Sequence, residues 1–381
     1  MQTVAPWQQL LLYHLSRVTC HPLPVTCYLS PHHLITPSPH HLITKNMQAL
    51  VLDGINQAVQ LREVSTPQPA AGEVQVRLHA AALNHRDVWI QKGQYAGLKF
   101  PIILGSDGAG TVTAVGEGAD ASLLGQAVLI NPGRQWGEHP AAQGRDFQIL
   151  GLPQDGTFAE YVCVEARQVR AKPAHLSFEQ AAALPLGGVT AYRAVFTRAA
   201  LQPGERVLIS GVGGGVALLA LQMAVAVGAE VWVTSGSEEK IARAVALGAK
   251  GGISYKAEKW PATLTKQAGG GFDVIVDSAA GPGFLDLLDA AAPGGRIVFY
   301  GATLGNMPSV PAAKVFWKQL SILGSTMGTE QDFAAMAELF EQHGIVPEID
   351  ETFALAEGEA ALRRMDEGLQ FGKIVLRIAA E

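Results

Sequence analysis

Cysteine is scarce in this chain, with 3 among 381 residues. Cys20 and Cys27 lie within the first 46 residues, so the remainder holds Cys163 alone and cannot form an internal disulfide. Cys163 stands in the apolar alternation Tyr161–Val164, which is typical of a small hydrophobic strand residue rather than a nucleophile. A single thiol of this kind predicts a reducing, cytoplasmic location.

Charged and aromatic residues are also few, at 16% and 7%, and the net charge is -6. No nucleic-acid partner is expected, because the chain lacks both the positive charge that attracts phosphates and a stacking platform for bases. The longest apolar run, residues 216–229, is too short for a bilayer and follows a glycine loop. It predicts a buried helix and no membrane partner.

Acidic residues are absent from residues 1–46, which also hold six of the 11 histidines and repeat the sequence SPHHLIT. We interpret this segment as a disordered N-terminal extension or a misassigned start; a transit peptide is the alternative. Its paired histidines could chelate a metal, but in a Pro-rich segment they are more often incidental. These histidines are His32, His33, His40 and His41.

The remaining chain, from Met47, is long and apolar enough for about two domains. Residues 47–171 contain short β-rich segments separated by Gly and Pro, which predicts a small barrel or sandwich. From residue 172 to 319 strands alternate with helices, which predicts a parallel, doubly wound sheet in an α/β fold. We expect residues 320–381 to return to the first domain.

The expected elements can be placed by residue. The strands of the first part include 73–78, 110–115 and 127–130. Those of the sheet are 206–210, 230–235, 252–255, 272–277, 296–300 and 320–323. Helices are expected at 331–343 and 357–367, with a closing strand at 373–378.

A glycine loop carries the most specific chemical signal. It lies between a strand and an apolar helix and consists of Gly211, Val212, Gly213, Gly214, Gly215 and Val216. Glycines let the backbone approach a pyrophosphate, whose charge is met by the amides and positive end of the following helix. A plain strand-to-helix corner is the alternative, but the spacing to the next strand favours a dinucleotide site.

The end of the second strand bears on the choice of nicotinamide cofactor. An acid at this position holds the ribose 2′-hydroxyl of NADH, whereas small polar and basic groups suit the 2′-phosphate of NADPH. Here Ser235, Ser237 and Lys240 follow the strand without an acid at its end. The sequence favours NADPH over NADH, although Lys240 could equally be a solvated surface charge.

Several motifs resemble those of the medium-chain dehydrogenase/reductase superfamily, which pairs a GroES-like barrel with a Rossmann domain and places its active site between them. The motifs are Gly105–Val112, Leu184–Tyr192, the glycine loop, Gly294–Gly301 and Gly372–Leu376. The chain is most similar to quinone oxidoreductases and zinc-type alcohol dehydrogenase-like reductases. It departs from their glycine loop at Val212 and Ala217.

Zinc-dependent members of the family hold a catalytic zinc ion with a cysteine, a histidine and a second cysteine. The resemblance implies that the matching positions in this chain are Asn84, Ser106 and Leu186. An amide, a hydroxyl and an aliphatic side chain do not replace thiolate or imidazole. A rearranged site with His85 and Asp107 is the alternative. The segment that matches the structural-zinc loop, residues 132–150, contains no cysteine, and we interpret its Glu138 and His139 as solvated residues.

The resemblance also implies a set of site residues. Asn84 and Tyr95 would donate hydrogen bonds in the substrate cleft and Trp89 would form its aromatic wall. Each could instead be structural, and Asp87 is expected to cap the segment 88–91. The residues implied around the cofactor are Thr190, Gly301, Ala302, Thr303 and Ser325. Thr190 could instead bond only its own helix backbone.

The predicted protein is therefore a zinc-independent, NADPH-preferring oxidoreductase that transfers hydride to a quinone or an α,β-unsaturated carbonyl. Such acceptors need mainly proximity and a hydrogen-bond donor for the developing oxyanion. A zinc-dependent alcohol dehydrogenase and a non-catalytic NADPH-binding protein are the alternatives. A homodimer is expected from the resemblance alone.

Overall fold

The computed structural model describes residues 45–379. The expected disordered extension therefore lies outside the described residues except for Lys45 and Asn46, and so do its paired histidines and Cys20 and Cys27. The described residues belong to one compact unit, and their first strand begins at Asn46. No helix within residues 45–379 is long and apolar enough to cross a membrane.

One part of this unit is a six-stranded sheet in the order β13-β12-β11-β14-β15-β16, in which every neighbouring pair is parallel. Its strands are β11 (Arg206–Ile209), β12 (Glu230–Ser235), β13 (Gly251–Ser254), β14 (Phe272–Asp277), β15 (Ala291–Phe299) and β16 (Ser321–Gly324). The strand order reverses between β11 and β14, and ligands of such sheets bind at the carboxyl ends of the strands near this point. This is the Rossmann arrangement that the alternating pattern predicts.

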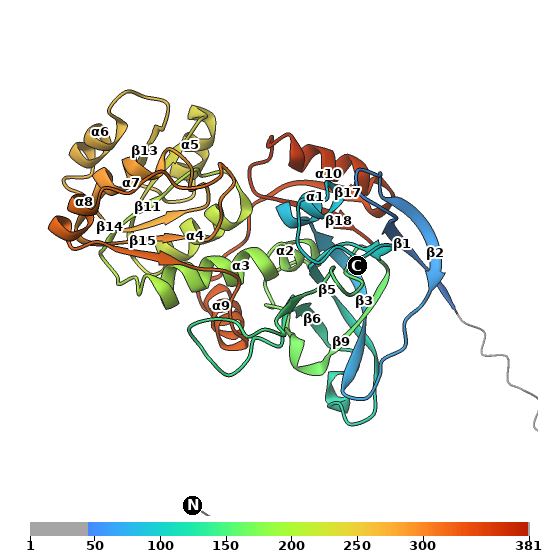
Figure 1. Ribbon diagram of the computed structural model, residues 1–381. Coiled ribbons are helices and arrows are strands. Elements are labelled where there is room, and N and C mark those ends of the chain that lie inside the picture. The colour runs from blue at the N-terminus through green and yellow to red at the C-terminus, as the bar shows by residue number, and fades with distance from the viewer. Residues whose placement is uncertain (1–44, 380–381) are drawn as a thin grey trace, which may run out of the picture. The chain divides into compact units, whose positions relative to one another are not determined.

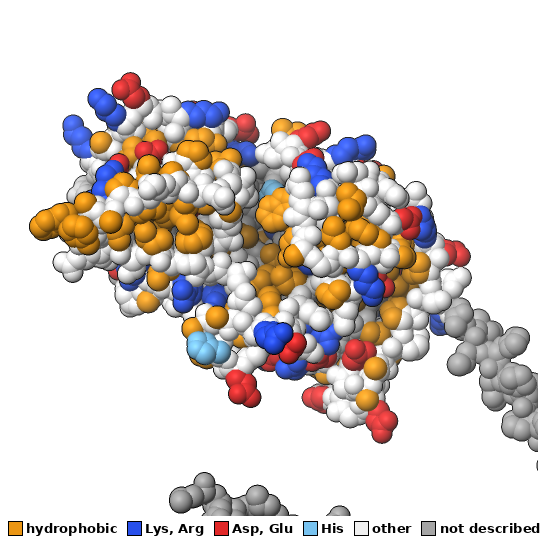
Figure 2. Space-filling model, viewed as in Figure 1, with side chains coloured by type: hydrophobic (Ala, Val, Ile, Leu, Met, Phe, Trp, Pro, Cys, Tyr) orange, Lys and Arg blue, Asp and Glu red, His pale blue; other side chains and the backbone are white. Residues whose placement is uncertain are grey.

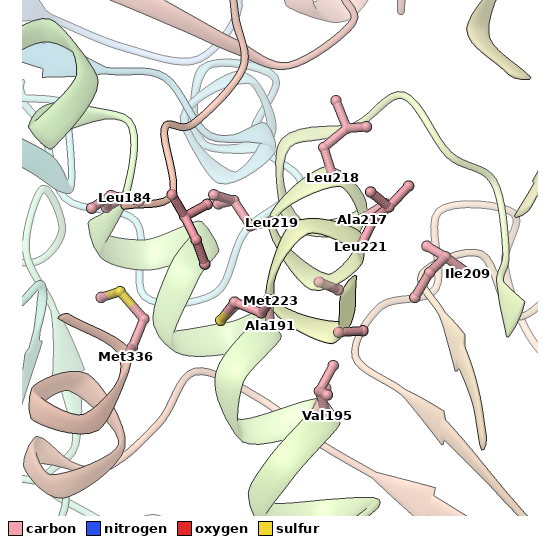
Figure 3. Close-up of a cluster of buried hydrophobic side chains, with 14 of the residues drawn as sticks. Leu184, Ala191, Val195, Ile209, Ala217, Leu218, Leu219, Leu221, Met223 and Met336 are labelled. Carbon is pink, nitrogen blue, oxygen red and sulfur yellow. The ribbon is translucent and has the colours of Figure 1, made fainter. Parts of the chain in front are cut away.

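Helices cover both faces of the parallel sheet (Figure 1). The helices of this part are α3 (Pro185–Tyr192), the π-helical η3 (Arg193–Arg198), α4 (Gly215–Ala226), α5 (Glu238–Ala246), α6 (Trp260–Gln267), α7 (Phe284–Ala290), α8 (Ala312–Lys318) and α9 (Glu330–His343). The short helix α2 (Phe178–Ala182) packs instead against strands of the antiparallel part. The helix α4 is apolar on all sides, and such a helix is stable only when it is surrounded by protein. It packs against α3 and α9, where Leu219, Met223 and Met336 lie in one buried cluster (Figure 3).

The other part is built mainly from antiparallel strands. Its largest sheet has the order β10-β6-β5-β3-β18-β17, and β9 pairs with β3. Two smaller sheets have the orders β2-β1-β4 and β7-β8. The strands of all three sheets are β1 (Asn46–Leu52), β2 (Gln60–Ser65), β3 (Glu73–Ala82), β4 (Ile102–Ile103), β5 (Asp107–Val115), β6 (Ala127–Ile130), β7 (Gly133–Arg134), β8 (Gln148–Ile149), β9 (Tyr161–Glu165), β10 (Val169–Ala171), β17 (Ile349–Ala354) and β18 (Lys373–Arg377). Short helices accompany them: α1 (His85–Gln91), η1 (Ala121–Leu123), η2 (Ala166–Gln168), η4 (Leu355–Glu357) and α10 (Gly358–Asp366).

The end of the chain returns to this antiparallel part, because β18 pairs with β3 and β17 pairs with β18. The sequence pattern does not predict β17, whose residues are half-buried or exposed and therefore lack a clear alternation. The parallel sheet extends to Gly324, slightly beyond the boundary at residue 319 that the sequence suggests. Cys163 is half-buried in β9, and burial raises the pKa of its thiol to about 12, which leaves it unreactive.

Candidate active-site cleft

Two adjoining cavities lie where residues of the parallel sheet meet residues of the antiparallel part. The first has a volume of about 240 Å³ and is lined from one side by Asn84, Trp89 and Tyr95 and from the other by the glycine loop. The second, of about 520 Å³, extends from that loop past Ser235 and Lys240. In Figure 2 hydrophobic side chains line a hollow in the middle of the molecule's face. Together the cavities form a cleft with a nucleotide-sized end and a smaller, more apolar end, which we call the substrate cavity.

The glycine loop has the backbone that its sequence predicts. Gly211 and Gly213 have φ angles of 67° and 138°, a range that favours glycine. Gly214 caps α4, and an added Cβ on Gly214 would meet nothing within 4 Å, so its surface is open to a ligand. A dinucleotide phosphate therefore fits the start of α4, where backbone amides and the helix dipole favour an anion.

The three residues that the sequence suggests for a 2′-phosphate line the larger cavity. Ser235 Oγ donates to the carbonyl of Val212 at 3.2 Å, and Ser237 caps α5 by accepting from the amide of Lys240. Lys240 Nζ donates to the carbonyl of Gln370 at 2.9 Å, and burial lowers the pKa of its ammonium. The lysine therefore lies within the cavity rather than on an open surface.

Only some of the other residues that the resemblance implies around the cofactor line the cleft. Thr190, Gly301 and Thr303 line the substrate cavity. Ala302 and Ser325 are not among the residues that line either cavity, and Thr326 and Met327 do so in place of Ser325. Thr190 Oγ1 donates to the carbonyl of Leu186 at 2.7 Å, which is the helix-backbone bond that the sequence left open as its alternative role.

A buried charge network lies under the substrate cavity. Lys373 Nζ donates to Asp107 Oδ2 and Asn84 Oδ1, both at 2.8 Å, and to the carbonyl of Leu83 at 2.7 Å. Asn84 Nδ2 donates to Asp107 Oδ2 at 3.0 Å, so both ends of its amide are held. The stem of Lys373 passes over the glycine loop, where a Cβ on Gly215 would come within 2.5 Å of its Cδ. Lys373 thereby joins the glycine loop to the Asn84 side of the cleft.

The residues at the family's zinc positions do not fit a zinc ion. Ser106 Oγ is bonded to Arg86 and to the carbonyl of Leu150, and Leu186 contributes only an aliphatic side chain. Both carboxylate oxygens of Asp107 are occupied, since Oδ1 accepts from the amide of Leu186 at 2.7 Å and Oδ2 accepts from Lys373. The described residues 45–379 contain no group of three potential metal-binding side chains. A neutral amide and a hydroxyl are poor replacements for thiolate and imidazole.

The helix α1 begins after Asn84, whose backbone amide is capped by the side chain of Asp87. The carboxylate of Asp87 accepts from the backbone amide of Asn84 at 2.8 Å, so the helix starts at His85, three residues before the segment that Asp87 was expected to cap. Asp87 is fully buried and its Oδ1 has no hydrogen-bond partner. Burial raises the pKa of this carboxyl from 3.8 to about 6.

This raised pKa gives a prediction for stability. The native state binds the Asp87 proton more tightly than the unfolded chain, so this group lowers the free energy of unfolding as pH rises from about 4 to about 6. Asp87→Asn is expected to remove this contribution, which amounts to about 3 kcal/mol above pH 7. Urea unfolding of both proteins from pH 4 to 8 checks this. A constant difference between them across that range would contradict the prediction.

Sequence reasoning does not single out Lys373, Met327 or Arg86, and it considers Asp107 only as a ligand of a rearranged zinc site. One signal was available for Lys373 and Asp107. Each is a charged residue at the start of a strand whose next three residues are uncharged, and charges in such places are seldom buried unless they are paired. Nothing local in the sequence indicates that these two residues pair with each other.

Comparison with known proteins agrees with this architecture. Residues 70–174 match the family of the alcohol dehydrogenase GroES-like domain, and residues 215–342 match the zinc-binding dehydrogenase family. The zinc-type alcohol dehydrogenase-like protein YogA of Leptosphaeria maculans is 36% identical over 84% of this chain and 94% of its own length. An acryloyl-coenzyme A reductase of Metallosphaera sedula is 30% identical over 87% of this chain and 99% of its own. The crystal structure of an NAD-dependent alcohol dehydrogenase has a TM-score of 0.83 and 38% identity, covering 87% of this chain and all of that one.

The Rossmann sheet, the glycine loop and these relatives together define an oxidoreductase that depends on a nicotinamide cofactor. The chain belongs to the medium-chain dehydrogenase/reductase superfamily. The fold class and the family that the sequence motifs predict are therefore confirmed. The cofactor's phosphate preference, the substrate and the independence from zinc stay predictions.

Proposed function

We propose that this protein uses NADPH to reduce a quinone or an α,β-unsaturated carbonyl compound, without a zinc ion. The observation that carries the proposal is the donor set of the substrate cavity. Hydrogen-bond donors face a cavity beside the glycine loop, while the side chains at the zinc positions are already bonded or aliphatic. Reduction of a reactive acceptor needs such donors. Oxidation of a simple alcohol needs a group that stabilises its alkoxide.

The preference for NADPH rests on the end of β12. Ser235 replaces the acid that holds a ribose 2′-hydroxyl, and Lys240 brings an ammonium group to the same cavity. A 2′-phosphate could accept hydrogen bonds from Ser235, Ser237 and Lys240. NADH remains a possible second cofactor, and one structural relative is described as NAD-dependent.

The substrate class has support from a relative that is named an acryloyl-coenzyme A reductase, since acryloyl thioesters are conjugated carbonyl compounds. When bound, the reduced nicotinamide supplies a hydride ion. The protein's own residues orient and stabilise the acceptor: Tyr95 donates a hydrogen bond, Trp89 and Met327 cover the cavity with apolar surface, and Lys373 fixes the amide of Asn84. A zinc-dependent alcohol dehydrogenase is the second candidate, favoured by the names of several relatives.

Removing the hydroxyl of Tyr95 tests its role as a donor. Tyr95→Phe is expected to lower kcat for an enone about 100-fold, because a general acid or donor contributes at least that much, while the KM for NADPH stays unchanged. Steady-state oxidation of NADPH measures both quantities. Tyr161→Phe is a matched control, because Tyr161 lies in β9, outside both cavities of the cleft. Equal kcat values for wild type and Tyr95→Phe would remove Tyr95 from the proposal.

A further inference from the structure

Arg86 brings a buried guanidinium group to the substrate cavity. The residue is 5% exposed and lines this cavity together with Tyr95 and Trp89. Its Nη1 donates to Ser106 Oγ at 2.6 Å and to the carbonyl of Leu150 at 2.7 Å. Its Nε lies 3.5 Å from the hydroxyl of Tyr95, and the guanidinium carbon lies 5.1 Å from the centre of that ring.

Within the described part of the chain this positive charge forms no ion pair, although it acts on the nearby carboxyl of Asp87 and opposes the rise of that group's pKa. Among residues 45–379, buried Arg193 and Lys373 each form an ion pair with an aspartate, whereas no carboxylate lies within 4.0 Å of the Arg86 nitrogens. Nη1 has two acceptors for its two hydrogens, whereas Nη2 forms no hydrogen bond with any of residues 45–379. Nη2 is not among the completely buried polar atoms that lack a partner, so a ligand can reach it. A buried cation without a directly bonded counter-charge is unfavourable, and it favours an anion in the adjoining space.

We infer that Arg86 is a catalytic residue that binds the acceptor's carbonyl oxygen and stabilises its negative charge during reduction. The inference rests on the proposed reductase function and names the group that replaces a metal ion as the electrophile. In the reduction of an enone the β-carbon gains a hydride, the electron pair of the C=C bond becomes the bond between the α-carbon and the carbonyl carbon, and the π pair of the carbonyl moves to its oxygen. When the α-carbon then takes a proton from water, the carbonyl re-forms and hydroxide is released. The hydride with its electron pair would come from the reduced nicotinamide when that cofactor is bound, and the saturated carbonyl compound leaves.

Arg86 suits this role better than the amide of Asn84. Asn84 Oδ1 and one N–H are held by Lys373 and Asp107, which leaves a single neutral N–H for a ligand. The free Nη2 of Arg86 carries positive charge, and hydrogen bonds from charged donors to an oxyanion are about twice as strong as neutral ones. The hydroxyl of Tyr95 beside Nε can provide a second donor to the same oxygen.

The main alternative is that Arg86 only ties α1 to the loop at Leu150. Ser106 Oγ also donates to the carbonyl of Leu150 at 2.8 Å, so this carbonyl keeps a partner when the guanidinium is removed. Arg86→Met should therefore fold, with a melting temperature within about 3 °C of wild type. A purely structural arginine would instead cause a larger fall in melting temperature and little specific loss of catalysis.

The test compares Arg86→Met and Arg86→Lys with wild type, using 3-penten-2-one and 1,4-benzoquinone as acceptors. Arg86→Met is expected to lower kcat for the enone about 100- to 1000-fold, as loss of an oxyanion donor does. Arg86→Lys keeps a positive charge and should recover part of the lost kcat. The loss should be at least tenfold smaller for the quinone, which is reactive without polarisation. Arg198→Met is the matched control, because Arg198 also donates to a backbone carbonyl but lies outside the cleft.

Binding of 4-nitrophenol gives a readout that does not depend on turnover. Its anion absorbs visible light, and Arg86 is expected to raise the ionised fraction of the bound compound at pH 6.5 above that in Arg86→Met. Equal losses for both acceptors, or equal ionised fractions in the two proteins, would overturn the inference. If wild type reduces neither acceptor, the proposed function fails. The 4-nitrophenol measurement then still decides whether Arg86 binds an oxyanion.

Discussion

Lys373→Met is expected to lower the free energy of unfolding by about 3–5 kcal/mol and kcat/KM by about 100-fold. The substitution leaves the carboxylate of Asp107, which is fully buried, without its ammonium partner, and breaking a buried ion pair on one side carries a cost of this size. It also releases the amide of Asn84 at the substrate cavity, and small misplacements of a site residue cost about 100-fold in rate. Urea unfolding and steady-state kinetics measure the two effects.

Two further variants distinguish the effect of an unpaired buried charge from the effect of removing any lysine. Adding Asp107→Asn to Lys373→Met removes the unpaired carboxylate, and most of the lost stability should return while activity stays low. Lys314→Met removes a half-exposed lysine paired with Asp289 and should cost less than about 1 kcal/mol. If Lys373→Met is as stable as Lys314→Met, the ion pair between Lys373 and Asp107 does not stabilise the buried network.

Ser235→Asp is expected to reverse the cofactor preference from NADPH to NADH. The new carboxylate would stand at the end of β12, where a ribose 2′-substituent is bound in Rossmann sheets. At about 5 Å and an effective dielectric constant of about 20, it would repel a 2′-phosphate by about 3 kcal/mol, roughly a hundredfold in the dissociation constant. The same carboxylate can accept a hydrogen bond from the 2′-hydroxyl of NADH.

Fluorescence titration with both cofactors measures this change directly. Ser321→Asp is the control, because it adds the same charge at an exposed position at the start of β16, away from both cavities of the cleft. It should leave both dissociation constants unchanged. If Ser235→Asp binds NADPH as tightly as wild type does, the cofactor does not place its phosphate at the end of β12, and the preference would need another origin.

The parts of the fold that follow from local sequence are the parts that the sequence predicts well. The strands β12 and β14 have the predicted bounds, because each is a short apolar run that ends at a turn. The glycine loop is equally local, since its positive φ angles and the helix after it depend only on neighbouring residues. Ser235, Ser237 and Lys240 line the predicted cavity for the same reason.

What the sequence does not predict depends on distant contacts. Lys373 and Asp107 are separated by 266 residues and meet only because β18 returns to pair with β3, the strand that also pairs with β5. The family resemblance implies Ala302 and Ser325 as cofactor residues, but neither lines the cleft, and after β16 its surface is formed by Thr326 and Met327. Arg86 likewise donates to two residues, Ser106 and Leu150, that lie in separate loops. Periodicity and motif spacing contain no information on such pairs.

The most direct test of a metal-free hydride transfer is the turnover of metal-stripped protein. Full-length protein is dialysed against a chelator, its zinc content is measured, and NADPH oxidation is followed with 3-penten-2-one before and after zinc is added. The proposed reductase retains its full rate with less than a tenth of an equivalent of zinc and gains nothing when zinc is restored. Loss of activity on stripping, with recovery in proportion to one bound zinc per chain, would contradict it.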